Sequence, residues 1–417
     1  MSKTVAEKIL LQHSDLKDIS PGQFIECDID LIMVHEQLGG RIHKEYEKLG
    51  IDYVWDQNKI FFILDHWVPA PTISAAQMHQ DCRAFAEKYN FIHNIGMDKG
   101  ICHQVLPEMG FSRPGMLIVG SDSHTTTYGA FNCLSTGIGA TDVSVVFATG
   151  KLWFKVPESF KIIFVGQLNK GIMSKDLILK IIGDITTKGA IYKSLEFHGI
   201  ESLSIDGRMT ISNMVVEAGA KFGVFLSDNK LENWIQKRSK EKYNIIHPDK
   251  EAIYEKSLEY NLSEIRPMVA KPSSPGNVEG IENVEGIEID QAFLGSCTNG
   301  RIEDLRIAAK ILKGKSINPK TRFIITPASK EVYIKAMKEG LLDIFINAGA
   351  VVTHSTCGAC IGGHMGVLGE EEVCISSTNR NFIGRMGAAS SQVYLASPAT
   401  VTASAIYGKI TDPREVL

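Results

Sequence analysis

Three cysteines carry the strongest chemical signal in the sequence. Cys297 stands sixty residues before Cys357, which forms a Cys-x-x-Cys pair with Cys360. All three lie in glycine-flanked segments, where backbone N–H groups can point at sulfur. Thiolates are the ligands that soft metals and iron–sulfur clusters prefer. Since a catalytic metal needs an open position for water or substrate, three protein thiolates on a four-iron cluster would suit catalysis.

Two other interpretations of these cysteines stay open. His354 or His364 could complete a zinc site with four ligands, and Cys357 and Cys360 alone could form a redox pair, although this leaves Cys297 unexplained. A zinc deaminase is excluded, because its signature needs a preceding His-x-Glu and a Pro before the first Cys. We expect the remaining cysteines to be small buried apolar side chains. They are Cys27, Cys82, Cys102, Cys133 and Cys374.

Five short apolar runs, which are typical of buried strands, lead directly into clusters of polar side chains. These runs are residues 59–64, 116–119, 291–294, 350–352 and 372–376. In open α/β sheets, ligands bind beyond the carboxyl ends of the strands, so we expect the five loops to meet at one site. Helical periodicity at residues 302–312 and 329–339 lies between them. The sequence therefore predicts an α/β fold.

The composition is that of a folded protein with no strong charge bias. The 417 residues include 44 Lys+Arg against 48 Asp+Glu, a net charge of −4, and 44% are hydrophobic. We therefore expect no nucleic-acid partner. No apolar run reaches about 18 residues, and the N-terminal segment is charged throughout. We expect a cytoplasmic protein without a membrane partner or a secretory signal.

The length predicts two to four domains. We place boundaries near Pro157 and after residue 276, which gives domains at 1–157, 158–276 and 277–417. Residues 271–276 are rich in Pro, Ser and Gly, and the sequence of 277–282 is repeated at 283–288. We expect such a duplication in an exposed linker.

Several motifs in colinear order resemble those of the aconitase superfamily. The motifs are Asp65-His66, Gly120–Thr125, Gly295–Arg301, Thr356–Cys360 and Asn379–Arg385. The resemblance covers the whole chain, and within the superfamily it is greatest to the large subunits of hydro-lyases that act on branched malates. It implies three α/β/α domains around a central iron–sulfur cluster, without the swivel domain of the superfamily.

The resemblance also implies roles for individual residues. Cys297, Cys357 and Cys360 would hold a [4Fe-4S] cluster whose fourth iron binds substrate. His66 would protonate the leaving hydroxyl group, and Asp65 beside it could raise its proton affinity and fix its tautomer.

A second group of residues would orient the reactants. Asp122 and His124 match the second Asp/His pair of the superfamily, with Ser123 between them as a substrate ligand. His103 matches a further active-site histidine. Asn213 and Glu217 are four residues apart, which predicts one helix face, and by resemblance they bond the cluster and its bound water.

The substrate of this resemblance is a dicarboxylate. Arg380 and Arg385 suit it because guanidinium groups donate in pairs to planar carboxylates, and Asn379 lies beside them. One loop departs from the superfamily pattern, since Glu36 replaces a usual Asp and Leu38 a usual Thr. We therefore expect the seating of the substrate to differ there.

The implied reaction converts 2-isopropylmalate into 3-isopropylmalate by dehydration and rehydration, in leucine biosynthesis. Homoaconitase and dimethylmalate dehydratase chemistry stay open, as does a non-catalytic iron–sulfur sensor, which would not need the acid and arginine groups together. In the superfamily the proton-abstracting base is a serine on the swivel domain. Only about thirty residues follow Arg385, so we expect a separate small subunit to supply that base.

Overall fold

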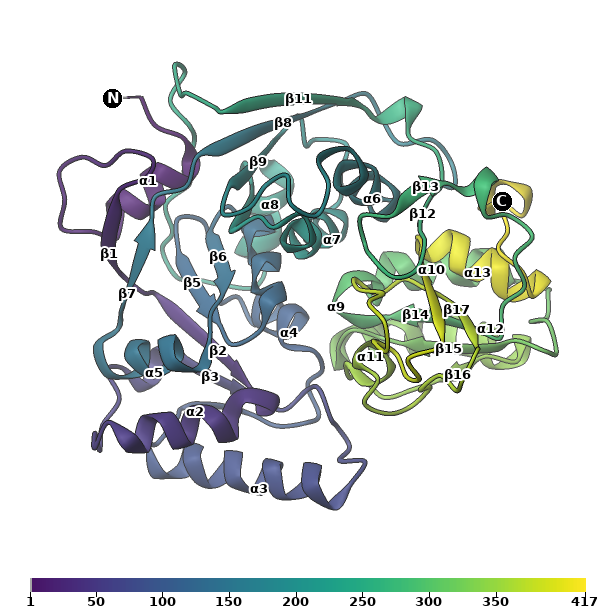
Figure 1. The fold of residues 1–417 in the computed structure, drawn as a ribbon, viewed down its shortest axis with the longest axis horizontal. Helices are drawn as coiled ribbons and strands as arrows, with labels where there is room; N and C mark the ends of the chain where they lie inside the picture. The colour runs from purple at the N-terminus through teal and green to yellow at the C-terminus, as the bar shows by residue number, and fades with distance from the viewer. Residues whose placement is uncertain (1) are drawn as a thin grey trace.

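Residues 2–417 are described by the computed structural model, in which helices cover four β-sheets (Figure 1). The three larger sheets are formed by successive parts of the chain. The one formed by the C-terminal part lies to the right of the other two in Figure 1. Within the described chain, every helix falls short of the length and apolarity that a bilayer span requires.

The first large sheet has five parallel strands in the order β4-β3-β2-β5-β6. They are β2 (Leu31–His35), β3 (Ile60–Ile63), β4 (His93–Ile95), β5 (Leu117–Gly120) and β6 (Leu134–Gly137). A two-stranded antiparallel ribbon of β1 (Phe24–Asp28) and β7 (Lys151–Lys155) flanks this sheet, and α1 (Val5–Gln12) precedes it.

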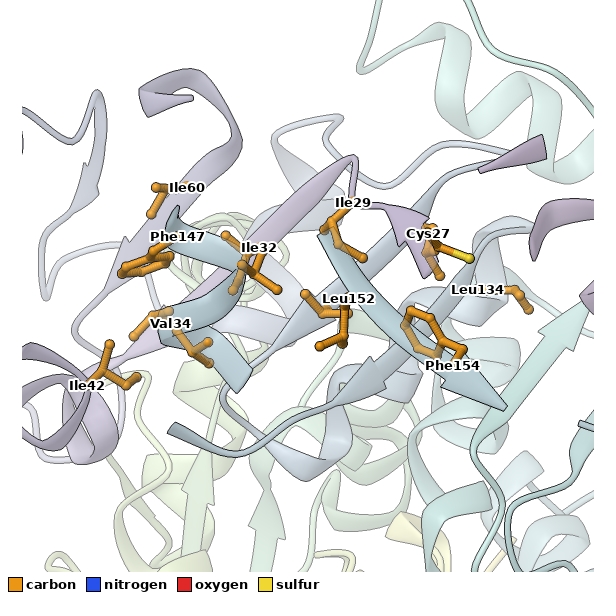
Figure 2. Close-up of a cluster of buried hydrophobic side chains, with 14 of the residues drawn as sticks. Cys27, Ile29, Ile32, Val34, Ile42, Ile60, Leu134, Phe147, Leu152 and Phe154 are labelled. Carbon is orange, nitrogen blue, oxygen red and sulfur yellow. The ribbon is translucent and has the colours of Figure 1, made fainter. Parts of the chain in front are cut away.

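Both faces of this sheet are buried, as a parallel sheet requires. Ile32 and Val34 of β2 face a core shared with α2 (Glu36–Lys48), α3 (Ile73–Lys88) and α5 (Ala140–Thr149), part of which Figure 2 shows. Leu31 and Met33 face the opposite core, which contains α4 (Cys102–Glu108) and the 3-10 segment η2 (Ser123–Phe131). The alternation follows from the two-residue period of a strand. Since the helices cover the two faces of the sheet, the carboxyl ends of its strands can carry polar loops.

The second large sheet has four parallel strands in the order β10-β9-β8-β11. They are β8 (Ser159–Val165), β9 (Ser194–His198), β10 (Phe222–Phe225) and β11 (Lys256–Asn261), with α6 (Ser174–Ile185), α7 (Ile205–Met214) and α8 (Asn229–Gln236) between them. Its core includes Ile178, Leu179 and Phe197. The short 3-10 segment η3 (Val215–Ala218) follows α7 directly.

The third large sheet has seven strands in the order β13-β12-β18-β17-β14-β15-β16, of which the last five are parallel. The strands are β12 (Met268–Ala270), β13 (Val278–Gly280), β14 (Gln291–Gly295), β15 (Arg322–Thr326), β16 (Val351–Val352), β17 (Val373–Ser376) and β18 (Gln392–Leu395). Its helices are α9 (Ser296–Asn299), α10 (Ile302–Leu312), α11 (Lys330–Lys338), α12 (Leu341–Ala348) and α13 (Pro398–Tyr407).

The α/β fold predicted from the sequence is confirmed. Each of the five predicted apolar runs overlaps a strand, and the two predicted helices are α10 and α11. The chain passes from the first sheet and its flanking ribbon to the second sheet between β7 and β8, on either side of Pro157. It passes from the second sheet to the third between β11 and β12. The domain bounds themselves stay a prediction.

The expectation of an exposed linker after residue 270 is wrong. Residues 271–277 form the turn of a hairpin between β12 and β13, in which the Lys271 N–H donates to the Asn277 carbonyl at 2.8 Å. Within the duplicated segment, Ile281 and Val284 are buried in the core of the third sheet. Apolar side chains at these positions pack, and the Pro, Ser and Gly residues serve a turn.

Candidate active site

The parts of the chain that form the three large sheets are called here the first, second and third regions. A cavity of about 670 Å³ opens where polar loops of these three regions meet. Its lining includes Leu38 and Ile138 from the first region, Val216 and Lys221 from the second and Ile361 from the third. Six of the residues predicted from the sequence also line it. They are His66, Asp122, Ser123, His124, Arg380 and Arg385.

His66 lies at the end of β3, buried between two carboxylates. Its Nδ1 donates to Asp65 Oδ1 at 2.5 Å, and its Nε2 lies 3.7 Å from Asp122 Oδ2. Asp65 Oδ2 accepts from the Cys102 N–H at 2.7 Å, which fixes the carboxylate. The tautomer of His66 is therefore set by Asp65, and Nε2 is the nitrogen that faces the cavity.

The charges around His66 favour its protonated form. Burial alone would lower the pKa of His66, but the neighbouring charge of Asp65 raises that pKa well above its ordinary value. Conversely, burial would raise the pKa of Asp65, and the charge of His66 lowers it to about 2. The pair is thus built to hold a proton on the imidazole near neutral pH.

Glu36, the residue that departs from the superfamily pattern, holds this loop in place. It is fully buried, and its carboxylate accepts from the backbone N–H groups of His66 at 2.7 Å, of Trp67 at 2.7 Å and of Asp65 at 3.1 Å. Three donors satisfy the buried carboxylate. Its role here is to position the Asp65–His66 turn, which the sequence does not reveal because the donors are backbone groups.

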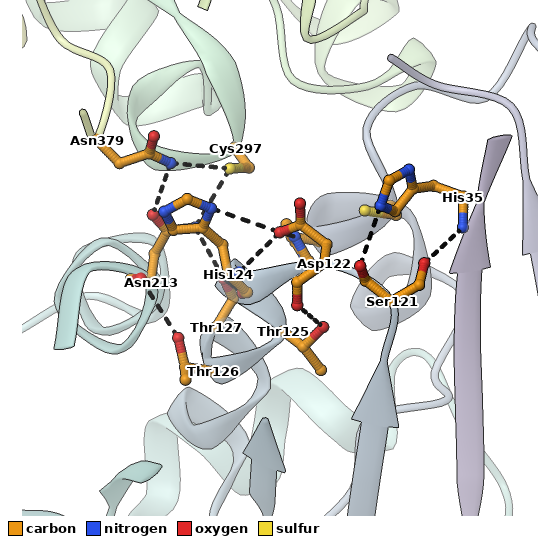
Figure 3. A network of polar contacts seen from close by, with 12 residues as sticks. His35, Ser121, Asp122, His124, Thr125, Thr126, Thr127, Asn213, Cys297 and Asn379 are labelled. Carbon is orange, nitrogen blue, oxygen red and sulfur yellow. Dashed lines mark hydrogen bonds and ion pairs between the residues drawn. The ribbon is translucent and has the colours of Figure 1, made fainter. Parts of the chain in front are cut away.

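His35 is a cavity residue that sequence reasoning did not single out. It ends β2, and its ring stacks on that of His66 with 4.2 Å between the ring centroids. Burial and the charge of His66 lower the pKa of His35 to about 4. Its backbone N–H donates to Ser121 Oγ and its Nε2 to the Ser121 carbonyl, as Figure 3 shows. Its position at the end of an apolar run, Leu31–Val34, was the available signal.

Asp122 is the centre of a histidine network after β5 (Figure 3). His103 Nε2 donates to Asp122 Oδ1 at 2.7 Å, and the His124 backbone N–H donates to the same oxygen at 2.7 Å. Burial would raise the pKa of Asp122, but the hydrogen bonds from His103, His124 and His66 hold it well below its usual range. Asp122 therefore stays ionised and orients three imidazole rings.

Glu217 connects this network to Arg380 on the substrate side. Its Oε1 accepts from His124 Nε2 at 2.8 Å and from Arg380 Nε at 2.8 Å. The predicted helix face shared by Asn213 and Glu217 is wrong, because α7 ends at Met214 and Glu217 lies in the 3-10 segment η3. Gly219, at φ +84, ends that segment. Because a 3-10 helix is wound more tightly than an α-helix, the Glu217 side chain leaves the backbone in a different direction from the one that α-helical spacing predicts.

The predicted arginines reach the cavity from the loop after β17. Besides Glu217, no described carboxylate pairs with Arg380, and none in residues 2–417 pairs with Arg385. Arg385 Nε is buried without a hydrogen-bond partner among the described residues. A guanidinium on a cavity wall without a carboxylate partner, as in Arg385, is well suited to bind a carboxylate.

Cys297 follows β14 in a turn with little freedom. A Cβ on Gly295 would lie 2.6 Å from the Thr326 carbonyl oxygen, so glycine is required there, and Ser296 adopts a left-handed φ of +71. The fully buried guanidinium of Arg301 donates to the Cys297 carbonyl at 2.5 Å and to the Thr298 carbonyl at 2.7 Å. Arg301 thereby fixes the loop that presents the thiol.

Two amide side chains point at the Cys297 sulfur, as Figure 3 shows. Asn213 Nδ2 lies 3.2 Å and Asn379 Nδ2 3.6 Å from Cys297 Sγ. Asn379 Nδ2 also donates to Asn213 Oδ1 at 3.2 Å, and Cys360 Sγ lies 3.8 Å from Asn379 Oδ1. N–H donors of this kind stabilise a thiolate and tune an iron–sulfur centre.

The loop of the Cys-x-x-Cys pair is fastened to the histidine loop. The Cys357 N–H donates to the Asp65 carbonyl at 3.1 Å, and Thr356 Oγ1 donates to the same carbonyl at 2.9 Å. The Cys360 N–H donates back to the Cys357 carbonyl at 2.9 Å. These hydrogen bonds therefore fix the loop of Cys357 and Cys360 relative to the loop of His66, although the two loops are far apart in sequence.

The arrangement fits an iron–sulfur cluster better than a single zinc ion. Tetrahedral zinc would bring its sulfur ligands to roughly 3.8 Å from one another, but Cys297, Cys357 and Cys360 do not form a group with ligand atoms within 4.8 Å in residues 2–417. His354 Nε2 donates to the Met97 carbonyl, and His364 Nε2 to the His66 carbonyl. Neither histidine is free to complete a zinc site in this arrangement, whereas the three buried thiols suit a larger, softer group.

The fold and this combination of side chains define a protein of the aconitase type. The family model described as "Aconitase family (aconitate hydratase)" matches residues 7–408, and the chain belongs to this family.

Curated relatives cover the whole chain. The "3-isopropylmalate dehydratase large subunit" of Hydrogenobaculum sp. (strain Y04AAS1) is 50% identical over 100% of this chain and 99% of its own length. The "3-isopropylmalate dehydratase large subunit 1" of Methanopyrus kandleri is 47% identical over 100% of both chains. Among solved structures, the holo-form of Thermococcus kodakaraensis aconitase X matches with a TM-score of 0.52 and 12% identity over 90% of this chain and 88% of that chain, which shows a shared fold.

Proposed function

We propose that this chain is the large subunit of a 3-isopropylmalate dehydratase, which interconverts 2-isopropylmalate and 3-isopropylmalate by removing and adding water. The observation that carries the proposal is that a histidine paired with a carboxylate and two arginines line one cavity, while hydrogen bonds join the loops of the buried thiols to the loops that carry these side chains. The full-length relatives at 50% and 47% identity support the choice of reaction.

Cys297, Cys357 and Cys360 would hold a [4Fe-4S] cluster. When bound, such a cluster supplies a Lewis acid at the iron that no protein thiolate occupies. The amides of Asn213 and Asn379 would orient toward the cluster sulfur through the contacts they already make with Cys297 Sγ.

His66 would act as the general acid. Its Nε2 faces the cavity, and Asp65 and Asp122 favour the proton it must donate to the leaving hydroxyl group. When water adds back, the same nitrogen would accept that proton. Glu36 would keep the ring in position during both steps through its bonds to the turn.

Arg380 and Arg385 would bind the two carboxylates of the substrate, with Ser123 and Asn379 beside them. Glu217 would fix the orientation of Arg380 by accepting from its Nε at 2.8 Å, which leaves the terminal nitrogens for substrate. Leu38, Ile138 and Ile361 line the same cavity and would receive an apolar branch. This apolar lining is what favours the isopropyl side chain.

A second candidate is the homoaconitase reaction, whose substrate carries a further carboxylate. Lys221 favours it, because this lysine lines the cavity and makes no ion pair with any carboxylate of the described chain. A dehydratase of dimethylmalate is a third candidate, favoured by the same apolar lining as the isopropyl substrate.

The relatives named "large subunit" imply a heteromeric partner. We assign to this small subunit the base that removes the carbon-bound proton and a loop that contacts the substrate side chain. We further propose that the assembly acts in the cytoplasm, in leucine biosynthesis.

Anaerobic reconstitution of the chain with iron and sulfide, followed by assays with and without a cognate small subunit, tests the proposal. We expect turnover of 2-isopropylmalate by the complex, weaker or no turnover of homocitrate and dimethylmalate, and none by the large chain alone. Turnover of homocitrate only would favour the second candidate. A loaded complex that turned over none of the three would support a non-catalytic iron–sulfur protein instead.

A further inference from the structure

A buried lysine behind the candidate site has no role in the chemistry described so far. Lys175 is the second residue of α6, and its relative exposure is 0%. Its Nζ donates to the Ser377 carbonyl at 2.9 Å and to the Thr378 carbonyl at 2.5 Å. No carboxylate of residues 2–417 forms an ion pair with it. Burying an ammonium group costs free energy unless hydrogen bonds compensate for the lost hydration. The bonds to the two carbonyls are therefore expected to matter.

The two carbonyls are those that set the position of the substrate-side loop. Ser377 and Thr378 leave the end of β17 and lead directly into Asn379 and Arg380. Because carbonyls at a strand end are not paired by the sheet, Lys175 supplies the donors they require. It thus determines where this turn of the third region lies against a helix of the second.

Ser377 also connects the turn to the loop of Cys297. The Gly295 N–H donates to Ser377 Oγ at 3.0 Å, and the Ser377 N–H donates to the Phe293 carbonyl at 2.9 Å. A displacement of Ser377 would therefore move both Arg380 and the segment that presents Cys297.

Burial and the neighbouring charges act on the pKa of Lys175 in opposite directions. Burial lowers the pKa of Lys175 to about 7, and the charges of Cys360, Asp304, Asp176 and Cys297 oppose that change. The ammonium and the neutral amine both carry N–H donors, so the bonds to the two carbonyls do not depend on the charge of Lys175.

We propose that Lys175 is a positioning residue which anchors the Ser377–Thr378 turn, so that Asn379 and Arg380 face the thiol site. The proposal deepens the function proposed above and rests on it. It assigns the first turn of α6 to the active site, although no side chain of that turn lines the cavity.

The test compares Lys175→Met, Lys175→Arg and wild type in the reconstituted complex with its small subunit. Lys180→Met is the matched control, since Lys180 lies on the same helix with its side chain exposed and paired with Asp184. We expect Lys175→Met to raise KM for 2-isopropylmalate roughly 10- to 100-fold, with kcat changed less than about threefold. Lys175→Arg should restore most of the binding, because it keeps N–H donors for the two carbonyls.

A second measurement does not depend on turnover. The reduction potential of the cluster in the reconstituted large chain should shift to a lower value in Lys175→Met, because a displaced Asn379 would no longer donate toward the Cys297 sulfur, and should return in Lys175→Arg. If Lys175→Met does not fold, Lys175→Gln, which can donate to only part of the carbonyl pair, takes its place.

Wild-type KM together with an unchanged potential in the Met or Gln variant would overturn the inference. So would an Arg variant as impaired as the Met variant in both measurements. If the wild-type complex does not turn over 2-isopropylmalate, the proposed function fails, while the potential of the loaded chain still decides the role of Lys175.

Discussion

His66 illustrates how the surroundings of one side chain select its chemistry. Asp65 accepts from Nδ1 at 2.5 Å, so the second nitrogen, Nε2, is the one left toward the cavity and toward Asp122. An imidazole held by a buried carboxylate in this way keeps its proton near neutral pH and gives it up to a developing oxyanion.

Replacing His66 by Ala should lower kcat by roughly 10² to 10⁴, the range for loss of a general acid. Steady-state kinetics of the reconstituted complex measures this, and the visible absorption of the cluster shows that it is still loaded. His198 is the matched control, because its Nε2 also bonds a carboxylate, Glu196 at 2.9 Å, away from the cavity. A His66→Ala complex with wild-type kcat would contradict the assignment.

Replacing Cys297, Cys357 or Cys360 by Ser should abolish the visible absorption of the reconstituted chain, because a serine oxygen is a poor ligand for iron in such a site. Cys374→Ser is the control, since Cys374 is equally buried but lies within β17. Spectra and iron content of the four variants separate the outcomes. One zinc and no iron in the wild-type chain would refute the cluster.

Residue types and their spacing predicted the thiols and the Asp65–His66 pair, because reactive side chains after strands stand out in a sequence. Glu36 and Arg301 were not predicted as supports. Glu36 satisfies its charge through backbone N–H groups, and Arg301 does so in part through backbone carbonyls. A backbone partner leaves no signature in the amino-acid types. Only the fold shows which N–H or C=O group such a side chain meets.

At the scale of the elements, strand ends do most of the positioning. The periodicity of apolar residues predicted β3, β5, β14 and β17, and the helices α10 and α11, because each has one consistent buried pattern. The change from α7 to η3 was not predictable from the four-residue spacing of Asn213 and Glu217. It depends on Gly219, whose left-handed conformation ends the segment.

The start of α2 supports the end of β3 through Glu36. Glu36→Gln should lower kcat/KM roughly tenfold, because an amide offers a single oxygen acceptor and turns its own N–H groups toward backbone donors. Glu45→Gln, on the partly exposed face of the same helix, should leave kcat/KM unchanged. Kinetics of the reconstituted complexes gives the ratio. A kcat/KM for Glu36→Gln equal to that of the control would show that the hydrogen bonds between Glu36 and the Asp65–His66 turn are dispensable.

For the whole molecule, the proposed cluster with only three protein thiolates predicts that the loaded state is sensitive to oxidants. An iron without a protein thiolate is the one most readily lost, so activity should decay in air and return with ferrous iron and a thiol reductant. Assays before aeration, after it and after repair measure this. Full activity after prolonged aeration with a chelator would argue against an open iron.

The tie between the Cys357 N–H and the Asp65 carbonyl has a consequence for biosynthesis on the ribosome. The strands of the first sheet end at Gly137, long before Cys297 and Cys357 leave the exit tunnel. Since chains fold from the N-terminus as they emerge, the acid-bearing loop forms early and waits for the cysteine loops. Metal insertion would then be among the last steps of maturation, after translation of the third region is complete.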